Sequence, residues 1–226
     1  SAGGGGKGMR IVRNEKDLAE NFQSAKNEAK SSFGDERIFI EKFVENPHHI
    51  EIQILGDKFG NFIHLGERDC SIQRRNQKII EEAPSPFIDS AIRDAMAAQA
   101  IKLAKSVNYF SAGTIEFIVD SQKNFYFLEM NTRLQVEHPV TELITKVDIV
   151  EQMIRIASGE PLKLNQEELS FNGCAIETRV YAEDPSRDFM PSVGRLTQYS
   201  PPNEIIDKKK QVRNDTGVCE GSNISF

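Results

Sequence analysis

The feature that most constrains the fold of this chain is the polar side chain at every second position from residue 129 to residue 137, with Met, Thr, Leu and Val between them. The polar positions are Glu129, Asn131, Arg133, Gln135 and Glu137. Because successive side chains of an extended chain point to opposite faces, these groups would line one face of a strand. A strand whose polar face is merely solvated alternates in the same way and remains the alternative. Two carboxylates, two amides and a guanidinium in unbroken order nevertheless favour a ligand-binding face.

Two segments that precede this stretch have the composition of paired β-strands. Residues 114–119 and 125–129 are rich in β-branched and aromatic side chains. Between them, residues 120–124 contain the Asp, Ser and Asn that are typical of turns. The sequence therefore predicts a β-hairpin that leads into the alternating stretch.

The register of this hairpin decides whether its carboxylates meet. A turn centred between residues 122 and 123 pairs Glu116 with Glu129, and Thr114 with Asn131. Like charges directly opposite each other destabilise a hairpin, so this pairing makes sense if a cation lies between them. Two carboxylates and the Asn131 amide are the hard oxygen ligands that Mg²⁺ takes when it also holds phosphates. A slip of one residue, which would separate the carboxylates, is the alternative.

Composition limits the classes of function that remain. The chain has 226 residues, of which 38% are hydrophobic and 27% charged, as in ordinary water-soluble proteins. Its net charge of −6 argues against non-specific binding of nucleic acid. No apolar run approaches the ~20 residues that span a bilayer, and no signal peptide opens the sequence. Cys70, Cys174 and Cys219 are few and widely spaced, which suits a reducing compartment.

The two ends of the sequence predict that it is a piece of a longer polypeptide. The chain opens on Ser1, Ala2 and four glycines without an initiator Met. It closes on residues 224–226, which have the composition of the start of a strand. We therefore expect further chain on both sides.

Periodicity along the chain predicts strands and helices in mixed order. The expected strands lie at residues 9–12, 37–44, 49–55, 62–65, 114–119, 125–129, 173–181 and near 195–199. The expected helices lie at residues 15–30, 89–106 and 148–158. Residues 71–82 are expected to be extended and basic in the middle.

Two further segments could contact phosphate. The glycine-rich residues 1–10 could wrap backbone N–H groups around phosphate oxygens, with Lys7 and Arg10 adding charge. A linker remnant is the alternative, and the segment matches neither a Walker A loop nor a dinucleotide fingerprint. Residues 73–78 contain three cations. They predict a solvated basic face or a site for a phosphate or a carboxylate substrate.

In their order and wording, these segments resemble the biotin carboxylase members of the ATP-grasp family. The matching stretches are residues 3–10, 41–43, 46–53, 67–78, 81–84, 129–142 and 182–185. The resemblance implies an α+β ATP-grasp fold whose domain is incomplete here. Residues 1–43 would be the lid piece, and residues 44–226 would be a mixed β-sheet body with helices, truncated at its end.

The resemblance also implies a role for individual residues. The residues implied to bind ATP are Gly5, Gly6, Glu41, Lys42, Phe43, Val44, His49, Gln73, Asn76, Glu116 and Glu129. Those implied to hold Mg²⁺ or Mn²⁺ are Glu116, Glu129 and Asn131, and those implied to bind bicarbonate are Lys78, Arg133 and Val136. The implied catalytic residues are Lys78, Arg133, Glu137 and Arg179.

In the family's chemistry, Glu137 would take the proton of bicarbonate, and Arg179 would bind biotin and stabilise its enolate oxygen. An ion pair between Arg179 and Glu177 or Glu183 is the alternative for that arginine. The biotin itself would be attached to a carrier domain outside this chain. The isolated fragment is expected to be inactive, because part of the nucleotide site is missing from it.

Within the family, the sequence is most similar to the biotin carboxylases of propionyl-CoA carboxylases. Asn76, where many members carry His, supports this likeness, as do residues 32–35 and 120–129. His48 departs from the usual Arg, which puts a charge contact there in doubt. The implied partners are a biotin carboxyl carrier domain and a carboxyltransferase (β) subunit in an oligomer, with neither nucleic acid nor a membrane. The implied location is the mitochondrial matrix, or the cytoplasm of a bacterium.

Three other functions remain open from the sequence. The chain could be the biotin carboxylase of another acyl-CoA carboxylase or of a pyruvate carboxylase. It could be a different ATP-grasp ligase, with an amino or acyl-phosphate chemistry independent of bicarbonate. It could also be a nucleotide-binding module without catalysis.

Overall fold

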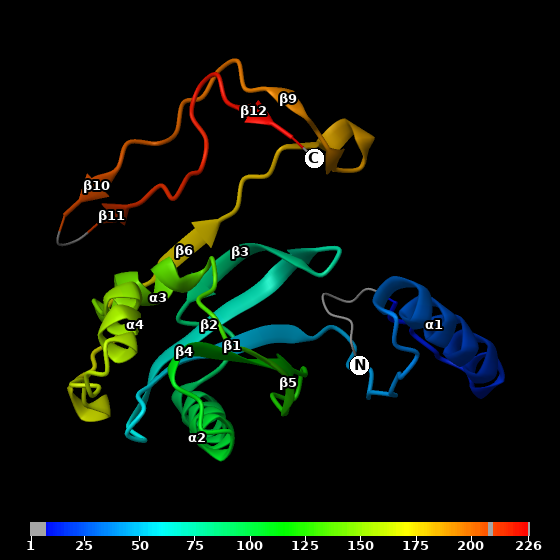
Figure 1. Ribbon diagram of the computed structural model, residues 1–226, viewed down its shortest axis with the longest axis horizontal. Coiled ribbons are helices and arrows are strands. Elements are labelled where there is room, and N and C mark those ends of the chain that lie inside the picture. The colour runs from blue at the N-terminus through cyan, green and yellow to red at the C-terminus, as the bar shows by residue number, and fades with distance from the viewer. Residues whose placement is uncertain (1–7, 208–209, 226) are drawn as a thin grey trace. The chain divides into compact units, whose positions relative to one another are not determined.

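The computed structural model describes residues 8–207 and 210–225, and the chain divides into two units, Ser1–Thr178 and Arg179–Phe226. The α+β class is confirmed, with helices and sheet both present in the first unit (Figure 1). Its main helices are α1 (Leu18–Phe33), α2 (Ser90–Ser106), α3 (His138–Thr145) and α4 (Ile149–Ala157). Short 3-10 turns lie at η1 (Glu15–Asp17) and η2 (Gln166–Glu168). The expected boundary between a lid and a body near residue 43 remains a prediction.

A six-stranded sheet forms the centre of this unit, in the order β5-β4-β1-β2-β3-β6. Its strands are β1 (His48–Gly56), β2 (Phe62–Arg74), β3 (Gln77–Ala83), β4 (Ser111–Val119), β5 (Phe125–Asn131) and β6 (Ala175–Thr178). All of its pairings are antiparallel, so the mixed sheet of the expectation is antiparallel throughout the described residues.

One face of the sheet is apolar and packs against α2. Alternate residues of β1, such as Ile50 and Ile52, and of β4, such as Ile115 and Phe117, are completely buried in one cluster with the alanines of α2. The helix begins where predicted, because the Asp89 carboxylate accepts a hydrogen bond of 3.0 Å from the backbone N–H of Ile92. Figure 1 shows α2 alongside β1 and β4.

The opposite face of the sheet is polar and yet buried. The same period of two that points isoleucines toward α2 points polar side chains the other way. These residues are His49, Glu51, Gln53, Arg68, Lys78, Thr114 and Glu116. Helix α3 lies against this side, where the Thr141 hydroxyl accepts a hydrogen bond of 3.0 Å from Arg68. Buried charge on this scale is costly unless every group is paired.

The register of the β4–β5 hairpin is the predicted one at its inner end. Glu116 pairs with Glu129, and Thr114 pairs with Asn131. The register then shifts, because Phe117 pairs with Phe127 and leaves Leu128 as the extra residue of a β-bulge. Directly paired residues share a face of the sheet. The two carboxylates therefore project to the same side.

Several predicted strands are shorter in the structure or missing from it. Residues 9–12 and 37–44 form no strand, because within the described chain no neighbouring strand pairs with them. A strand propensity is expressed only where such a partner exists. The alternating stretch is extended only as far as Asn131, and the expected strand at 173–181 is limited to β6.

Helix α3 was not predicted at all. Pro139 lies in its first turn, where the missing N–H of proline has no intrahelical acceptor to lose. The chain after Asn131 therefore turns into a helix instead of continuing along the sheet. None of the helices in the described chain is both long and apolar enough to cross a membrane.

The second unit consists of short two-stranded ribbons. They pair β7 (Glu183–Asp184) with β8 (Met190–Pro191), β9 (Gly194–Arg195) with β12 (Asn223–Ile224), and β10 (Ile205–Ile206) with β11 (Gln211–Val212). A short 3-10 turn, η3 (Pro185–Arg187), lies between β7 and β8. The strand expected at 195–199 is thus reduced to β9.

Candidate active site

The Lys78 ammonium lies among three carboxylates on the polar face of the sheet. Its Nζ donates to Glu51 Oε2 at 2.5 Å, to Glu116 Oε1 at 2.7 Å and to Glu137 Oε1 at 2.7 Å. Only 11% of the Lys78 side chain is exposed, and the carboxylates are more deeply buried still. A cluster of one cation and three anions at this depth needs further positive charge.

Strand register brings these residues together. Glu51 of β1 pairs directly with Glu116 of β4, so their side chains project to the same face. Lys78, near the start of β3, reaches them across β2. Glu137 occupies the N-cap position at the start of α3, and it is 2% exposed. Residues distant in sequence are thus fixed by four regular elements.

Arg68 of β2 supplies the second buried cation. Its side chain is completely buried, and its Nε donates to Glu51 Oε1 at 2.6 Å. Glu51 is therefore held between two cations, one on each carboxylate oxygen. Such a pair contributes little net stability but becomes strongly destabilising when one partner is removed.

These contacts set the charge of the site. Burial by itself would raise the pKa of Glu116, but the hydrogen bond with His49 and the charge of Lys78 outweigh it and lower the pKa to about 2. The pKa of Glu51 is also lowered, because Arg68 and Lys78 together outweigh its burial. The pKa of Lys78 is raised despite burial, chiefly by Glu51. At neutral pH, Glu51 and Glu116 are therefore ionised beside an ionised Lys78.

The predicted metal ligands lie next to this cluster. Asn131 Nδ2 donates to Glu116 Oε1 at 2.9 Å, and the exposed Glu129 is the cross-strand partner of Glu116. An ionised carboxylate, a second carboxylate on the same face and an amide carbonyl make a hard oxygen donor set that suits Mg²⁺. The residues therefore fit the predicted cation. In the described chain, the donor atoms of His49, Glu51 and Glu116 also lie within 4.8 Å of one another.

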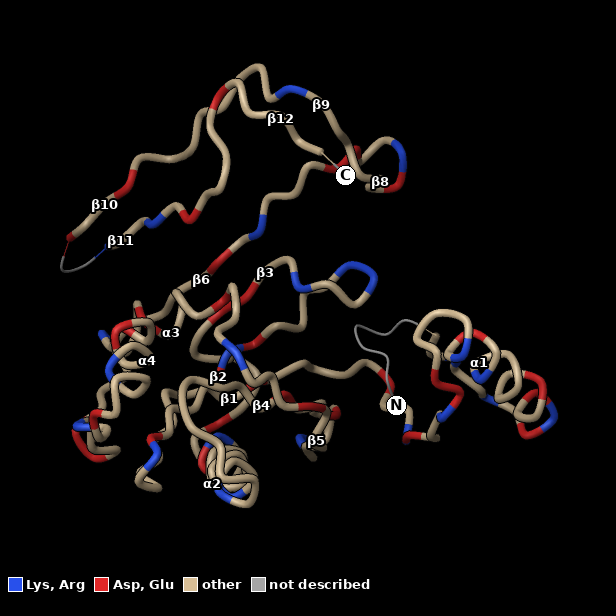
Figure 2. Tube along the Cα trace, in the orientation of Figure 1, with Lys and Arg blue, Asp and Glu red and all other residues tan. Residues whose placement is uncertain are grey.

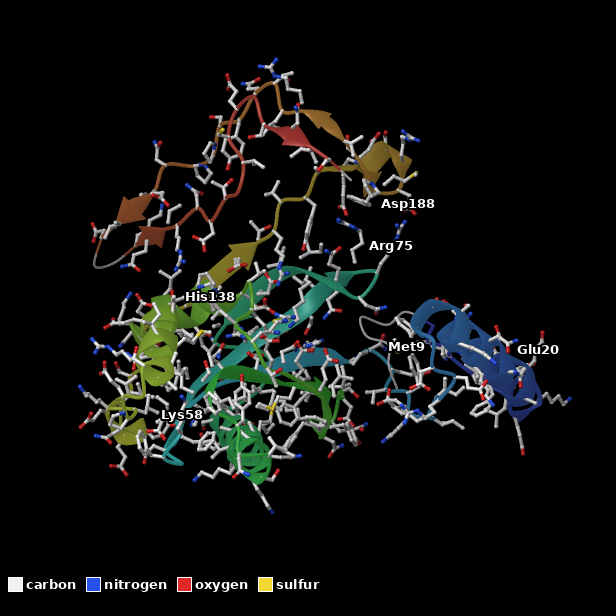
Figure 3. The ribbon with its side chains drawn as sticks, in the orientation of Figure 1. Met9, Glu20, Lys58, Arg75, His138 and Asp188 are labelled. Carbon is white, nitrogen blue, oxygen red and sulfur yellow. The ribbon has the colours of Figure 1, made fainter. Side chains whose placement is uncertain are left out.

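The predicted nucleotide residues fall into two groups. His49 lies at the cluster, with its Nε2 3.0 Å from Glu116 Oε2 and its Nδ1 3.0 Å from Gln73 Nε2. Asn76 lies farther out, in the turn between β2 and β3 with a positive φ of 64°. Figure 2 shows the basic residues of this turn, and Figure 3 labels Arg75 at its outer end.

The predicted hinge, residues 41–44, lacks regular structure. Lys42 Nζ donates to the Tyr126 hydroxyl of β5 at 3.0 Å, which joins this segment to the strand that carries Glu129. Phe43 is half exposed, and Arg13 lies over its ring. The predicted Gly5 and Gly6 lie outside the described residues.

The remaining predicted residues are Arg133, Val136 and Arg179. The exposed Arg133 borders a cavity of about 270 Å³ with Tyr109, Phe110 and Met153. Val136 is 60% exposed in the turn before α3. Arg179 follows β6 and belongs to the second unit.

Sequence reasoning missed Glu51 and Arg68, which complete the cluster, and it gave Gln135 only as a member of the alternating polar face. Gln135 donates from Nε2 to Glu116 Oε1 at 3.0 Å. The alternation of residues 49–55 did contain a signal for Glu51, since it places that carboxylate on the same face as His49. Nothing local distinguishes Arg68 from a solvated strand arginine, because its burial depends on α3 and on strands far away in sequence.

Comparison with protein families gives two matches that together cover most of the chain. Residues 1–165 match the family described as the carbamoyl-phosphate synthase L chain, ATP binding domain. Residues 177–226 match the biotin carboxylase C-terminal domain.

Among curated proteins, the propionyl-CoA carboxylase alpha chain of Ruegeria pomeroyi is 65% identical, over all of this chain and 35% of its own length. The mitochondrial propionyl-CoA carboxylase alpha chain of Sus scrofa is 61% identical, over all of this chain and 30% of its own length. The chain thus spans about a third of the curated relatives that it matches.

Among solved structures, the biotin carboxylase domain of the Hydrogenobacter thermophilus 2-oxoglutarate carboxylase superposes with a TM-score of 0.89. It is 52% identical, and the match covers all of this chain and 49% of that one. That domain was solved with ADP, magnesium and bicarbonate. The likeness confirms the expected ATP-grasp fold, since it extends over the whole chain.

Proposed function

Because the chain belongs to the family described as the carbamoyl-phosphate synthase L chain, ATP binding domain, and continues into a biotin carboxylase C-terminal domain, we propose that the intact protein carboxylates biotin. The reaction consumes ATP and bicarbonate, and the biotin is carried on a separate carrier domain. The observation that supports this most directly is the buried cluster in which Lys78 contacts three carboxylates. One of them, Glu116, is also the cross-strand partner of Glu129.

In this proposal Glu116, Glu129 and Asn131 would hold Mg²⁺ or Mn²⁺, which would supply positive charge beside the ATP phosphates. Residues 41–44 bind the adenine, and His49, Gln73 and Asn76 contact the nucleotide. Gly5 and Gly6, which lie outside the described residues, would contact the phosphates. The family resemblance supplies these assignments, and the contacts of His49 and Asn131 with Glu116 agree with them.

Bicarbonate binds to Lys78, Arg133 and Val136 in this proposal. Bicarbonate is a poor electrophile until it is phosphorylated, so ATP first converts it into carboxyphosphate. Glu137, which is buried and positioned by α3 next to Lys78, takes the bicarbonate proton. Carboxyphosphate then breaks down into CO₂ and phosphate, and this phosphate takes the proton of the biotin ureido nitrogen. Arg179 stabilises the oxygen of the resulting enolate, whose nitrogen attacks CO₂ to form N-carboxybiotin.

We assign the final acceptor to propionyl-CoA, because both curated relatives described above are named propionyl-CoA carboxylase alpha chains. A biotin carboxyl carrier domain and a carboxyltransferase (β) subunit are then the partners of the intact protein in an oligomer. The porcine relative is named as mitochondrial. The location is accordingly the mitochondrial matrix, or the cytoplasm if the source is a bacterium.

The test is the transfer of labelled bicarbonate to biotin by the full-length protein. We expect fixation that requires ATP and Mg²⁺, and a loss of about 100-fold or more in Glu116→Gln and in Arg133→Ala. Glu151→Gln, which alters an exposed glutamate paired with Arg155 on α4, is the matched control and retains activity. Unchanged fixation in both site variants refutes the assignment. ATP hydrolysis independent of bicarbonate indicates another ATP-grasp ligase, and ATP binding without turnover indicates a non-catalytic module.

A further inference from the structure

Arg68 uses every hydrogen-bond donor of its guanidinium within the protein. The side chain is completely buried. Its five donations go to Glu51 Oε1 at 2.6 Å, Gln53 Oε1 at 2.7 Å, Thr141 Oγ1 at 3.0 Å, Thr114 Oγ1 at 3.2 Å and Gln135 Oε1 at 2.9 Å. A guanidinium has five N–H groups in a rigid plane. Its orientation is therefore fixed by acceptors on β1, β4, α3 and the loop before α3.

Two of these acceptors also form hydrogen bonds with residues of the candidate active site. Glu51 accepts from Arg68 on one oxygen and from Lys78 on the other, at 2.5 Å. Gln135 accepts from Arg68 through its carbonyl and donates through its amide to Glu116, at 3.0 Å. Lys78 also donates to Glu116 at 2.7 Å, so the five side chains form a closed ring.

We propose that Arg68 is a positioning residue, which orients Glu116 through Gln135 and Lys78 through Glu51. This inference rests on the proposed function, because Glu116 is there a metal ligand and Lys78 a bicarbonate ligand. Mutation of a group that fixes the orientation of a metal ligand typically costs about 10- to 100-fold in metal affinity. Arg68 orients two ligands at once, because its planar guanidinium contacts both Glu51, which holds Lys78, and Gln135, which holds Glu116.

The variant Arg68→Lys tests the orienting role of the guanidinium separately from its positive charge. The ammonium keeps the positive charge beside Glu51, but it is a point charge with three donors on a flexible stem. It cannot hold both Glu51 and Gln135 in the geometry of the guanidinium. The two arms of the ring therefore lose their common anchor, while the net charge of the site stays the same.

The experiment compares Arg68→Lys with the parent in the full-length protein. We expect the KM for Mg²⁺ and the KM for bicarbonate to rise about 10-fold or more, with a smaller change in kcat. The Kd for Mg²⁺·ADP, measured by titration calorimetry without turnover, rises by a similar factor. Retention of all three constants at parent values overturns the proposal.

The matched control is Arg93→Lys. Arg93 forms a largely buried pair in which its Nη2 donates to Glu67 Oε1 at 2.7 Å, joining α2 to β2 outside the ring. A purely structural role for Arg68 predicts that both variants lower Tm and leave the constants alone. We expect Arg93→Lys to lower Tm without moving KM or Kd, whereas Arg68→Lys moves both.

If Arg68→Lys does not fold, Thr141→Val decides the question, because it removes one acceptor of Arg68 and keeps the guanidinium. We expect a rise of about threefold in the Kd for Mg²⁺·ADP, from the loss of one hydrogen bond. No rise overturns the proposal. A parent that binds Mg²⁺·ADP but shows no ATP hydrolysis dependent on bicarbonate refutes the proposed function, and calorimetry still decides the role of Arg68.

Discussion

Glu116 and Glu129 face each other across the hairpin but differ in their surroundings. Glu116 is 4% exposed and accepts hydrogen bonds from Lys78, Asn131 and Gln135 on one oxygen. Glu129 is exposed on an edge strand. The same substitution at the two positions therefore distinguishes the contribution of each carboxylate to stability from its contribution to ligand binding.

We expect Glu116→Gln to lower the free energy of unfolding by about 3 kcal/mol, because it leaves Lys78 with one fewer buried counter-ion. Glu129→Gln should change that free energy by less than about 0.5 kcal/mol, as exposed substitutions usually do. Both should abolish binding of Mn²⁺·ADP. Urea unfolding and a Mn²⁺ titration of the full-length protein make the comparison. Equal stability of the two variants contradicts the buried contacts of Glu116.

The pH dependence of stability should report on Glu116. Its pKa is about 2 in the folded protein, compared with an ordinary value of 4.5. Because the folded pKa is the lower one, the contribution to stability is complete above pH 4.5 and is lost as pH falls toward 2. The Tm of the parent, measured in the absence of metal, should therefore fall more steeply over this pH range than the Tm of Glu116→Gln. Parallel curves contradict this expectation, and Glu151→Gln serves as the control.

At the scale of elements, β2 depends on a glycine in a bulge. Ile52 pairs with Glu67 and Ile54 with His64, so two residues of β2, one of them Gly66, lie opposite a single residue of β1. Gly66 has a φ of +79°, and a Cβ there would lie 2.7 Å from a ring atom of Phe171. Both observations indicate that other residues fit poorly at this position.

Gly66→Ala should therefore lower the free energy of unfolding by about 1–3 kcal/mol, through backbone strain and the displacement of Phe171. Gly217→Ala is the matched control, since Gly217 does not have a φ in the left-handed region and has open space around its Cα. We expect its stability to stay within about 0.5 kcal/mol of the parent. Denaturant unfolding of both variants decides, and equal stability of the two contradicts the strain argument.

The elements also mark the limit of prediction from sequence. The capped helices α2 and α4 and the inner register of the hairpin follow from local signals, such as the Asp89 and Asp148 caps. The prediction of strands at residues 9–12 and 37–44 was wrong, because strand formation depends on a partner strand that local composition does not specify. The cluster at Lys78 could be predicted only in part, since Arg68 enters it through tertiary packing alone.

At the scale of the whole molecule, the site joins β1, β2, β3, β4 and α3, so a ligand bound there should stabilise all of them together. We expect Mg²⁺·ADP at 100 times its Kd to add about 2.7 kcal/mol to the stability of the full-length protein. Lys78→Met should abolish the additional stabilisation by bicarbonate. Calorimetric unfolding with and without each ligand measures both effects. An unchanged Tm in the presence of saturating Mg²⁺·ADP contradicts a nucleotide site in this unit.

The bulge at Leu128 separates the hairpin into two parts with different registers. Outward from it, the strands close through the Asp120–Asn124 turn, whose length fixes the pairing of Phe117 with Phe127. Without the extra residue, the outer register would place Glu116 opposite Leu128 instead of Glu129. The bulge therefore aligns the acidic pair, and its loss through a register slip of one residue would turn the Glu129 side chain to the other face of the sheet.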